Sequence, residues 1–437
     1  MPHTIGIRRE DINKWERRAP LIPAHVRELI RDHGLEVLIQ PSKIRVFADT
    51  DYASEGARVQ EDICPSRTVF AIKEIPIESL AKEKVYVFFS HTAKGQHYNM
   101  PMLKRMMELG CTIIDYEKIV NEKGQRLLYF GSYAGQAGMI DSLWALGRRL
   151  KLEGIETPFL RLSQTIHYKS LVEAKEEVAE VGRLIHKKGL PSRLIPFVCG
   201  FLGYGHVSQG AQEIYDLIPH DTVSPKDLAG LFRKTGPSAC GLYKVVFKEE
   251  DMVRPAAPGG TFDLQDYYRE PGKYVPVVES YIPYLSLLIN GIYWTAKYPK
   301  YITKPFLAKL YGGDVPPRLK VVGDITCDID GSVECTVKPT DSEEPVYVYD
   351  AAKDTALMGI EGNGPVVMAV YNLPAELPIE SSAFFSGCLK KYVPAIASAD
   401  FRGPFDNCVL PPEVRKAVIL YRGELTPDYK YLSGYLA

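Results

Sequence analysis

Short apolar runs alternate with helical patterns along much of the chain. The runs at 68–75, 85–91 and 111–117 read TVFAIKEI, VYVFFSH and CTIIDYE, and each passes from apolar residues into polar or charged ones. Helical patterns lie between such runs, as in PAHVRELIRDHG, where Gly34 is a typical helix C-cap. Because parallel strands need a crossover helix between them, this alternation predicts an α/β fold with mainly parallel sheets.

Length and two connecting segments predict how the chain divides. A chain of 437 residues is too long for one typical core, so we expect at least two domains. A long helical pattern at 135–152 predicts a connector, and a proline-marked loop followed by a helix after residue 370 predicts a return to the first domain. We therefore expect one domain from residues 1–140 plus 380–437, and a second, dinucleotide-binding domain from 141–379.

Composition excludes several classes of protein. A hydrophobic share of 46% with a net charge of -1 indicates a globular protein with no basic surface for nucleic acid. The eight cysteines form no C-x-x-C pair, so neither a metal site nor a disulfide framework is expected. The apolar stretch 275–294 is broken by Glu279 and two prolines, which argues against a membrane span. With a polar N-terminus, we expect a cytoplasmic protein, or a mitochondrial matrix protein if a presequence was removed.

Three of the predicted strands end in groups that can transfer protons or bind anions. Lys73 and Glu74 follow one strand, His91 follows the next, and Glu117 follows the third. Ligands of open α/β sheets gather at the carboxyl ends of the strands. We therefore expect a site there. Lys94, just after His91, either assists with carboxylates or phosphates or is a solvated loop lysine.

A glycine-rich turn lies between a predicted strand and a predicted helix near residue 203. Such a turn lets the backbone approach a pyrophosphate, which also meets the N–H groups of the helix N-terminus. In the pattern G-x-G-x-x-G, Ser208 replaces the third glycine, so a tight turn with packing glycines remains an alternative. The residues predicted to contact a cofactor here are Gly203, Tyr204, Gly205, His206 and Val207.

The residues at the end of the strand after this helix are expected to determine whether the protein prefers NAD(H) or NADP(H). An acidic residue at the end of that strand binds the ribose 2′-hydroxyl of NAD. Here we place Asp221 before the strand and Ser224 and Lys226 at its end. A hydroxyl and a cation tolerate a 2′-phosphate better than a carboxylate does, so NADPH is predicted rather than NADH.

Several motifs occur in one order along the whole chain and together resemble a known family. They are IGIRREDINKWERRAPLIPAHV, KEIPIE, FFSHTAKGQ, DYEKIVNEKGQRLLYFGSYAGQAGMID, GYGHVSQGAQEIY, LINGIYW and NLPAELPIES. The chain resembles the lysine-ketoglutarate reductase domain of aminoadipic semialdehyde synthase and, more distantly, fungal saccharopine dehydrogenase and the alanine dehydrogenase/transhydrogenase group. The resemblance implies two Rossmann-like domains with the active site in the cleft between them.

The implied reaction belongs to lysine degradation. It condenses L-lysine with 2-oxoglutarate and reduces the product with NADPH to L-saccharopine; a saccharopine dehydrogenase domain, fused or separate, would be the partner. By motif, the substrate-cleft residues fall on Arg18, Lys73, Glu74, His91, Glu117 and Arg126. Relatives commonly carry Asp where this chain has Tyr371, which puts that carboxylate's role in the cofactor pocket in doubt.

The chemistry itself needs such residues. The substrates carry three carboxylates, which suit the guanidinium groups of Arg18 and Arg126. The lysine amine must lose a proton before it attacks, and the carbinolamine needs a proton donor when water leaves. Lys73 and His91 are the predicted catalytic residues for these transfers, while Glu74 and Glu117 temper the positive charge.

Three other functions remain open. The first is an NAD-dependent saccharopine dehydrogenase that forms L-lysine, with the same fold and proton-transfer residues. The second, alanine dehydrogenase, is disfavoured by the motifs SHTAKGQ and NGIYW. The third is a ligand-sensing relative without turnover, which retention of Lys73, His91 and both arginines argues against.

Overall fold

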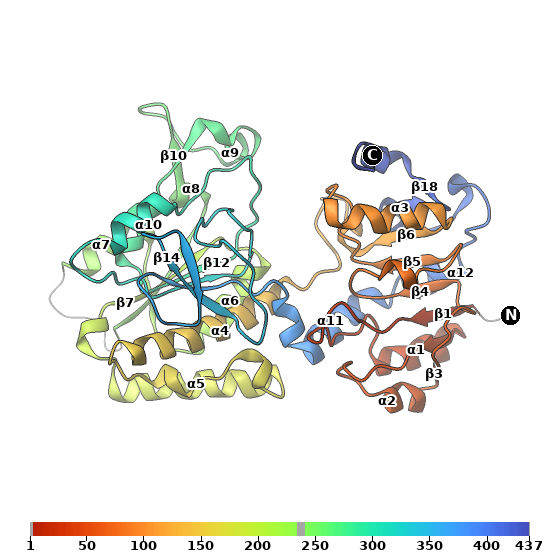
Figure 1. Cartoon of the computed structure of the whole chain (residues 1–437), viewed down its shortest axis with the longest axis horizontal. Coiled ribbons are helices and arrows are strands. Elements are labelled where there is room, and N and C mark those ends of the chain that lie inside the picture. The colour runs from red at the N-terminus through yellow and green to blue at the C-terminus, as the bar shows by residue number, and fades with distance from the viewer. Residues whose placement is uncertain (1–2, 234–240, 437) are drawn as a thin grey trace. The chain divides into compact units, whose positions relative to one another are not determined.

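The computed structural model describes residues 3–233 and 241–436. The chain forms two compact units, Met1–Phe130 with Pro378–Ala437, and Gly131–Leu377. Each unit is an α/β layer structure around a mainly parallel sheet, which confirms the predicted fold class (Figure 1). The division expected after residue 140 would cut helix α4 (Gly131–Leu152), which is continuous and lies wholly within the second unit.

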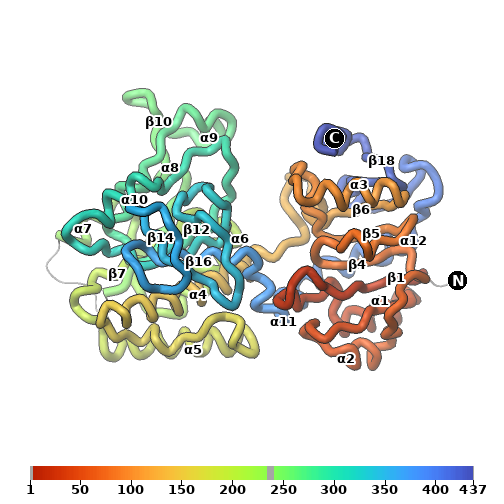
Figure 2. The backbone as a smooth tube through the Cα atoms, in the orientation of Figure 1, coloured from red at the N-terminus to blue at the C-terminus, as the bar shows by residue number. Residues whose placement is uncertain are grey.

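An eight-stranded sheet forms the centre of the first unit. In order across the sheet, its strands are β18 (Glu424–Leu425), β17 (Val418–Tyr421), β6 (Thr112–Asp115), β5 (Val85–Phe88), β4 (Thr68–Phe70), β1 (Thr4–Ile7), β2 (Glu36–Ile39) and β3 (Arg58–Val59). The strands from β6 to β3 are parallel to their neighbours, whereas β17 is antiparallel to β6. In Figure 2 the blue C-terminal segment accordingly runs among the red and orange elements of this unit.

Six α-helices accompany this sheet among the described residues. They are α1 (Pro23–His33), α2 (Asp49–Ser54), α3 (Met100–Glu108), α11 (Pro378–Leu389), α12 (Val393–Ser398) and α13 (Pro412–Lys416). Helix α1 ends at Gly34, whose φ of 60° lies in the left-handed region that favours glycine, so the predicted C-cap is confirmed. Both faces of the sheet are buried, which explains the continuous apolar runs in β4 and β5.

The second unit also contains an eight-stranded sheet. Its order is β15 (Thr355–Met358), β14 (Val346–Asp350), β16 (Val366–Met368), β13 (Val321–Asp324), β12 (Leu287–Asn290), β7 (Phe197–Leu202), β9 (Leu242–Phe247) and β8 (Asp221–Thr222). In this sheet the strands from β16 to β8 are parallel to their neighbours, whereas β14 is antiparallel to both β16 and β15. A small hairpin, β10 (Val253–Pro255) with β11 (Tyr274–Pro276), lies outside this sheet.

Close packing of two helices shapes the second unit. Its α-helices besides α4 are α5 (Leu171–Lys188), α6 (His206–Tyr215), α7 (Leu228–Leu231), α8 (Glu249–Met252), α9 (Leu264–Arg269) and α10 (Lys304–Tyr311). A Cβ atom on Gly135 of α4 would collide with the backbone oxygen of Val207, and one on Gly210 of α6 would collide with that of Ser132. The two glycines therefore let the helix backbones touch. Across the described residues, no helix is both long and apolar enough to cross a membrane.

Candidate active site

The carboxyl ends of four neighbouring parallel strands bring the predicted substrate residues to one edge of the first sheet. Strands β6, β5, β4 and β1 are adjacent and parallel, so the segments that follow them emerge at the same edge. Lys73 and Glu74 follow β4, His91 follows β5 and Glu117 follows β6. Glu10, which the sequence analysis did not single out, follows β1.

His91 and Glu74 form a hydrogen-bonded pair. The Nδ1 atom of His91 lies 2.6 Å from Oε1 of Glu74, and the side chains are 27% and 15% exposed. Asn99 donates from Nδ2 to the same oxygen at 3.3 Å and to the Ser90 carbonyl at 3.1 Å. Burial alone would raise the pKa of Glu74, but the hydrogen bond and charge of His91, with the charge of Lys73, lower this pKa to about 2.

This pairing fixes the roles of the ring nitrogens. A carboxylate ionised at neutral pH only accepts hydrogen bonds, so Nδ1 of His91 carries the proton that it donates to Glu74. The other ring nitrogen, Nε2, is then the atom that can exchange a proton with a ligand. The backbone at His91 has a φ of 49°, an unusual conformation for a residue other than glycine. Glu74 thus positions the imidazole, a more specific role than the tempering of charge that the sequence predicts.

Lys73 lies beside this pair in a mixed electrostatic environment. Burial, followed by the charge of Arg18, lowers the pKa of Lys73, whereas Glu74, Glu16 and Glu10 act in the opposite direction. A lowered pKa makes an ammonium a better proton donor and its neutral amine more accessible near neutral pH.

Glu10 holds the chain at Lys73. Its carboxylate accepts the backbone N–H groups of Ile72 at 2.6 Å and of Lys73 at 3.0 Å. Burial and the charge of Glu16 raise the pKa of Glu10 to about 7. A glutamate three residues past a buried strand was the available signal for this group, but the sequence does not tell whether it faces the neighbouring strand or solvent.

Arg18 is buried and already bound to a carboxylate of its own chain. Its Nε and Nη2 atoms donate to the two carboxylate oxygens of Glu16 at 2.7 and 2.6 Å. Its guanidinium carbon lies 4.2 Å from the ring centroid of Phe130. A substrate carboxylate would therefore bind this guanidinium beside Glu16 or in its place, and the predicted role of Arg18 in substrate binding stays a prediction.

Glu117 and Arg126 pair with each other. An ion pair joins the Arg126 guanidinium to the Glu117 carboxylate, and Arg126 is half-exposed. The backbone N–H of Glu117 donates at 2.8 Å to Asp115, whose other carboxylate oxygen accepts from the backbone N–H of Ser90. Through this ion pair with Glu117, Arg126 lies at the same edge of the sheet as the other predicted site residues. The pair lines a cavity of about 400 Å³ together with Lys416.

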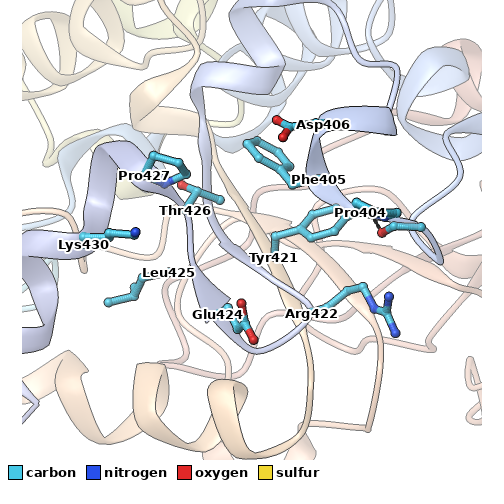
Figure 3. A pocket seen from close by; sticks show the side chains of 11 residues that line it. Pro404, Phe405, Asp406, Tyr421, Arg422, Glu424, Leu425, Thr426, Pro427 and Lys430 are labelled. Carbon is cyan, nitrogen blue, oxygen red and sulfur yellow. Dashed lines mark hydrogen bonds between the residues drawn. The ribbon is translucent and has the colours of Figure 1, made fainter.

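A larger cavity in the same unit lies away from this chemistry. It has about 570 Å³ and is lined by Tyr421 and Arg422 at the β17–β18 turn and by Lys430 in the segment after β18, among other residues (Figure 3). Because β17 runs antiparallel to β6, its end at Tyr421 lies at the amino ends of the parallel strands. Arg422 accordingly donates its backbone N–H to Thr112, the first residue of β6, at 3.1 Å. The size of this cavity therefore does not make it the active site.

The glycine turn of the second unit has the geometry of a dinucleotide-binding turn. Gly203 follows β7 with a φ of 85°, and Gly205 is the N-cap of α6, so His206 and Val207 open the helix. Ser208 is tolerated at the third position of the motif because its hydroxyl turns inward and donates to the Gly203 carbonyl at 2.7 Å. With the open helix N-terminus, the turn fits the pyrophosphate of a nicotinamide dinucleotide.

The residues that the sequence predicts to select between NAD(H) and NADP(H) do not lie where that prediction places them. The strand beside β7 is β9, not β8, which lies one strand further out. Asp221 lies within β8 rather than before it, and Ser224, which follows, donates to Asp227 at 2.5 Å. Ser224 and Lys226 therefore do not end the strand beside the glycine turn. The sequence shows which segment follows α6 but not which strand the sheet places next to β7.

The residues at the end of β9 take that position instead. Lys248 and Glu249 follow β9 directly, and Glu249 lines a cavity of about 430 Å³. The other residues lining this cavity are Gly203, Tyr204, Gly205, Met252, Tyr267, Tyr268, Gly291, Ile292, Tyr293, Tyr298 and Tyr301. The carboxyl ends of β9, β7 and β12 thus all contribute to one cavity beside the glycine turn.

Two further residues from the sequence analysis lie on exposed surface. Lys94 is exposed in the segment after β5. Tyr371 follows β16, is 48% exposed, and donates its backbone N–H to Thr340 at 3.3 Å.

Comparisons with known proteins identify a matching family model and several similar curated proteins. Residues 6–137 match the family described as "Alanine dehydrogenase/PNT, N-terminal domain". Over 98% of its length the chain is 38% identical to the alpha-aminoadipic semialdehyde synthase of Arabidopsis thaliana and 35% identical to the mitochondrial one of Rattus norvegicus. It covers 41% and 47% of these proteins, so it spans less than half of their length. A saccharopine dehydrogenase (NAD(+), L-lysine-forming) of Neurospora crassa is 26% identical over 88% of this chain and 89% of that protein.

Solved structures agree with the fold. An L-alanine dehydrogenase superposes with a TM-score of 0.64 at 19% identity, covering 99% of this chain and all of that chain. A transhydrogenase from Sinorhizobium meliloti superposes with a TM-score of 0.56 at 13% identity, covering 97% and 100%. These likenesses show the fold of two Rossmann-like domains. The chain is thus similar to the alpha-aminoadipic semialdehyde synthases along nearly its whole length and has the fold of the L-alanine dehydrogenase structure.

Proposed function

We propose that the chain is a lysine-ketoglutarate reductase, which condenses L-lysine with 2-oxoglutarate and reduces the product to L-saccharopine. The observation that carries this proposal is the His91–Glu74 pair beside Lys73, whose pKa is lowered, at the carboxyl ends of the strands. Two proton-transfer groups that lie close together suit a reaction that must deprotonate an amine and protonate a departing hydroxyl. The names of the relatives, which include both the synthases and lysine-forming saccharopine dehydrogenases, support the substrate class.

In this proposal Lys73 and His91 move the protons. The side-chain amine of lysine has a reference pKa of about 10.4, so a base must remove its proton before it attacks the ketone. Neutral Lys73, or His91 through Nε2, accepts that proton. The same groups return a proton to the carbinolamine hydroxyl as it leaves as water, and an imine remains. Glu74 keeps the imidazole in one orientation throughout both transfers.

The charged residues around these groups bind the substrates. Arg126, half-exposed beside a cavity, is placed to receive a carboxylate in exchange for Glu117. Arg18 is the second carboxylate-binding residue of the proposal, preorganised by Glu16 and Phe130. An existing carboxylate partner at each arginine holds the guanidinium in place before substrate arrives.

A nicotinamide dinucleotide fits the glycine turn of the second unit. Gly203, Gly205 and the first turn of α6 would hold its pyrophosphate. When bound, the reduced cofactor supplies the hydride that converts the imine to the secondary amine of saccharopine. The sequence predicts NADPH, but the residues on which that prediction rested lie elsewhere, so the choice between NADPH and NADH depends on the end of β9.

A lysine-forming saccharopine dehydrogenase is the second candidate. It uses the same proton transfers in reverse and is favoured by the similarity to the fungal enzymes and by the carboxylate at the end of β9. A saccharopine dehydrogenase domain, fused or separate, remains the proposed partner. For location we keep the cytoplasm and the mitochondrial matrix; the names of the rat and mouse relatives favour the matrix.

An absorbance assay tests this proposal. Oxidation of the reduced cofactor is followed with L-lysine and 2-oxoglutarate together and with each omitted in turn. We expect turnover only with both substrates, and saccharopine as the product by mass spectrometry. Oxidation of NADH or NADPH with pyruvate and ammonia instead would indicate an alanine dehydrogenase. Binding of lysine without any turnover would indicate the ligand-sensing alternative.

A further inference from the structure

The cavity beside the glycine turn contains one carboxylate whose hydrogen-bonding capacity is only partly used. Oε1 of Glu249 accepts the hydroxyl of Tyr268 at 2.6 Å. Oε2 of Glu249 is buried, and among the described residues it has no hydrogen-bond partner. A buried carboxylate oxygen without a donor is costly, so a ligand that brings a donor to it is favoured.

The position of Glu249 just after β9 indicates which group of a ligand would contact it. Gly203 donates its backbone N–H to the carbonyl of Phe247, the last residue of β9, at 3.0 Å, so the end of β9 lies directly beside the glycine turn. In dinucleotide-binding folds, the residue at the end of this neighbouring strand faces the adenosine ribose. Glu249 is the second residue past Phe247 and lines the cavity together with Gly203 and Gly205.

The remaining walls suit a nucleoside. Tyr204 and Tyr268 flank Glu249. Burial first, and then hydrogen bonding to Glu249 and the charge of Glu249, raise the pKa of both phenols. Met252, Ile292 and further tyrosines supply apolar and aromatic surface against which a base can stack. A volume of about 430 Å³ lies within the range of roughly 300–1,000 Å³ that is usual for ligand pockets.

We infer that Glu249 accepts hydrogen bonds from the ribose hydroxyls of NAD(H) and makes this chain prefer NAD(H) over NADP(H). The inference rests on the proposed function only in that this cavity holds the adenosine half of a nicotinamide dinucleotide. A 2′-phosphate, which is mostly dianionic at neutral pH, would place its negative charge against the carboxylate and would replace the 2′-hydroxyl donor. The exposed Lys248, which neighbours Glu249 but does not line the cavity, is the group that would favour a 2′-phosphate instead.

Equilibrium binding tests this inference without turnover. Dissociation constants for NADH and NADPH are measured by nucleotide fluorescence, and those for AMP and 2′,5′-ADP by calorimetry, in the absence of lysine and 2-oxoglutarate. We expect the wild-type chain to bind NADH at least ten-fold more tightly than NADPH, and AMP more tightly than 2′,5′-ADP. In Glu249→Gln, NADH should bind about ten-fold more weakly, because a charge-assisted hydrogen bond is lost, and the discrimination against NADPH should shrink.

Matched variants complete the test. Glu250→Gln removes one negative charge from the exposed neighbouring position and should leave both affinities unchanged. Glu249→Asp retains the charge and should keep the preference for NADH, which guards against a variant that merely fails to fold. Tighter binding of NADPH by the wild-type chain, or equal affinities for NADH in the wild-type chain and Glu249→Gln, would overturn the inference. Failure of the substrate assay alongside selective NADH binding would instead overturn the proposed reaction.

Discussion

Replacement of Glu74 by Gln tests whether the pair with His91 organises the active site. The change preserves the size of the side chain but removes the charge that accepts the hydrogen bond from Nδ1 at 2.6 Å. Because the pKa of Glu74 is lowered from 4.5 to about 2, the ionised carboxylate of Glu74 stabilises the folded state. At 1.36 kcal/mol for each pKa unit, this shift corresponds to about 3 kcal/mol as an upper figure.

The pH dependence of this contribution has a definite sign. A carboxylate whose pKa is depressed by folding stabilises the folded state fully above its unfolded pKa of about 4.5, and the contribution is lost as the pH falls toward 2. We therefore expect Glu74→Gln to lower the stability of the first unit at pH 7 by up to about 3 kcal/mol. The difference from the wild-type chain should diminish between pH 4.5 and pH 2. Urea unfolding at a series of pH values measures it.

The same variant should affect catalysis through His91. Loss of a charge-assisted hydrogen bond of about 1.5–3 kcal/mol predicts a ten- to hundred-fold lower kcat/KM, since the imidazole is no longer held in one tautomer. A double-mutant cycle with His91→Gln should give a coupling energy well above zero. Glu78→Gln, at an exposed glutamate on a nearby segment, is the matched control and should change neither property. Wild-type stability and kcat/KM in Glu74→Gln, with no coupling to His91, would refute this reasoning.

Three more predictions concern other groups. Lys73→Met and His91→Gln should each lower kcat/KM by a large part of the 10²–10⁴-fold typical of acid–base groups. The loss of kcat/KM in the double variant should be well below the product of the two single losses. Strictly multiplicative losses would show that the residues do not share the proton transfers. Arg126→Ala should raise KM with unchanged thermal stability, whereas Arg18→Ala should also destabilise the fold by roughly 3–5 kcal/mol, because the buried Glu16 loses its ion pair with Arg18. Equal melting temperatures for the two variants would contradict this difference. Gly210→Ala should strongly lower the melting temperature by forcing α6 away from α4, and a near-normal melting temperature would show that the helices can separate at little cost.

The local pattern of the sequence was sufficient to predict which residues follow the strands at the candidate site. A buried strand exposes its following residues at its carboxyl end whatever sheet it joins, so Lys73, Glu74 and His91 could be predicted from the apolar runs before them. The helix ending at Gly34 and the turn at Gly203 likewise depend on neighbouring residues, through capping and a left-handed backbone conformation.

The partners of these residues depended on tertiary structure. Glu16 shares the motif of Arg18, but only the folded chain shows that it occupies the Nε and Nη2 donors of the guanidinium. Glu10 was missed because it accepts backbone N–H groups of the segment after β4, 62 and 63 positions away in sequence. Such contacts leave no periodic signal.

The order of strands was likewise decided by the tertiary structure. The sequence places the segment with Ser224 directly after α6, and nearness in sequence suggested that it lies beside the glycine turn. The sheet instead inserts β9 between β7 and β8, because the buried six-residue β9 pairs along the whole length of β7, whereas β8 is short and exposed. The strands that can bury both faces occupy the inner positions of a parallel sheet, and this depends on long-range packing. As a result, Glu249 rather than Ser224 lines the cofactor cavity.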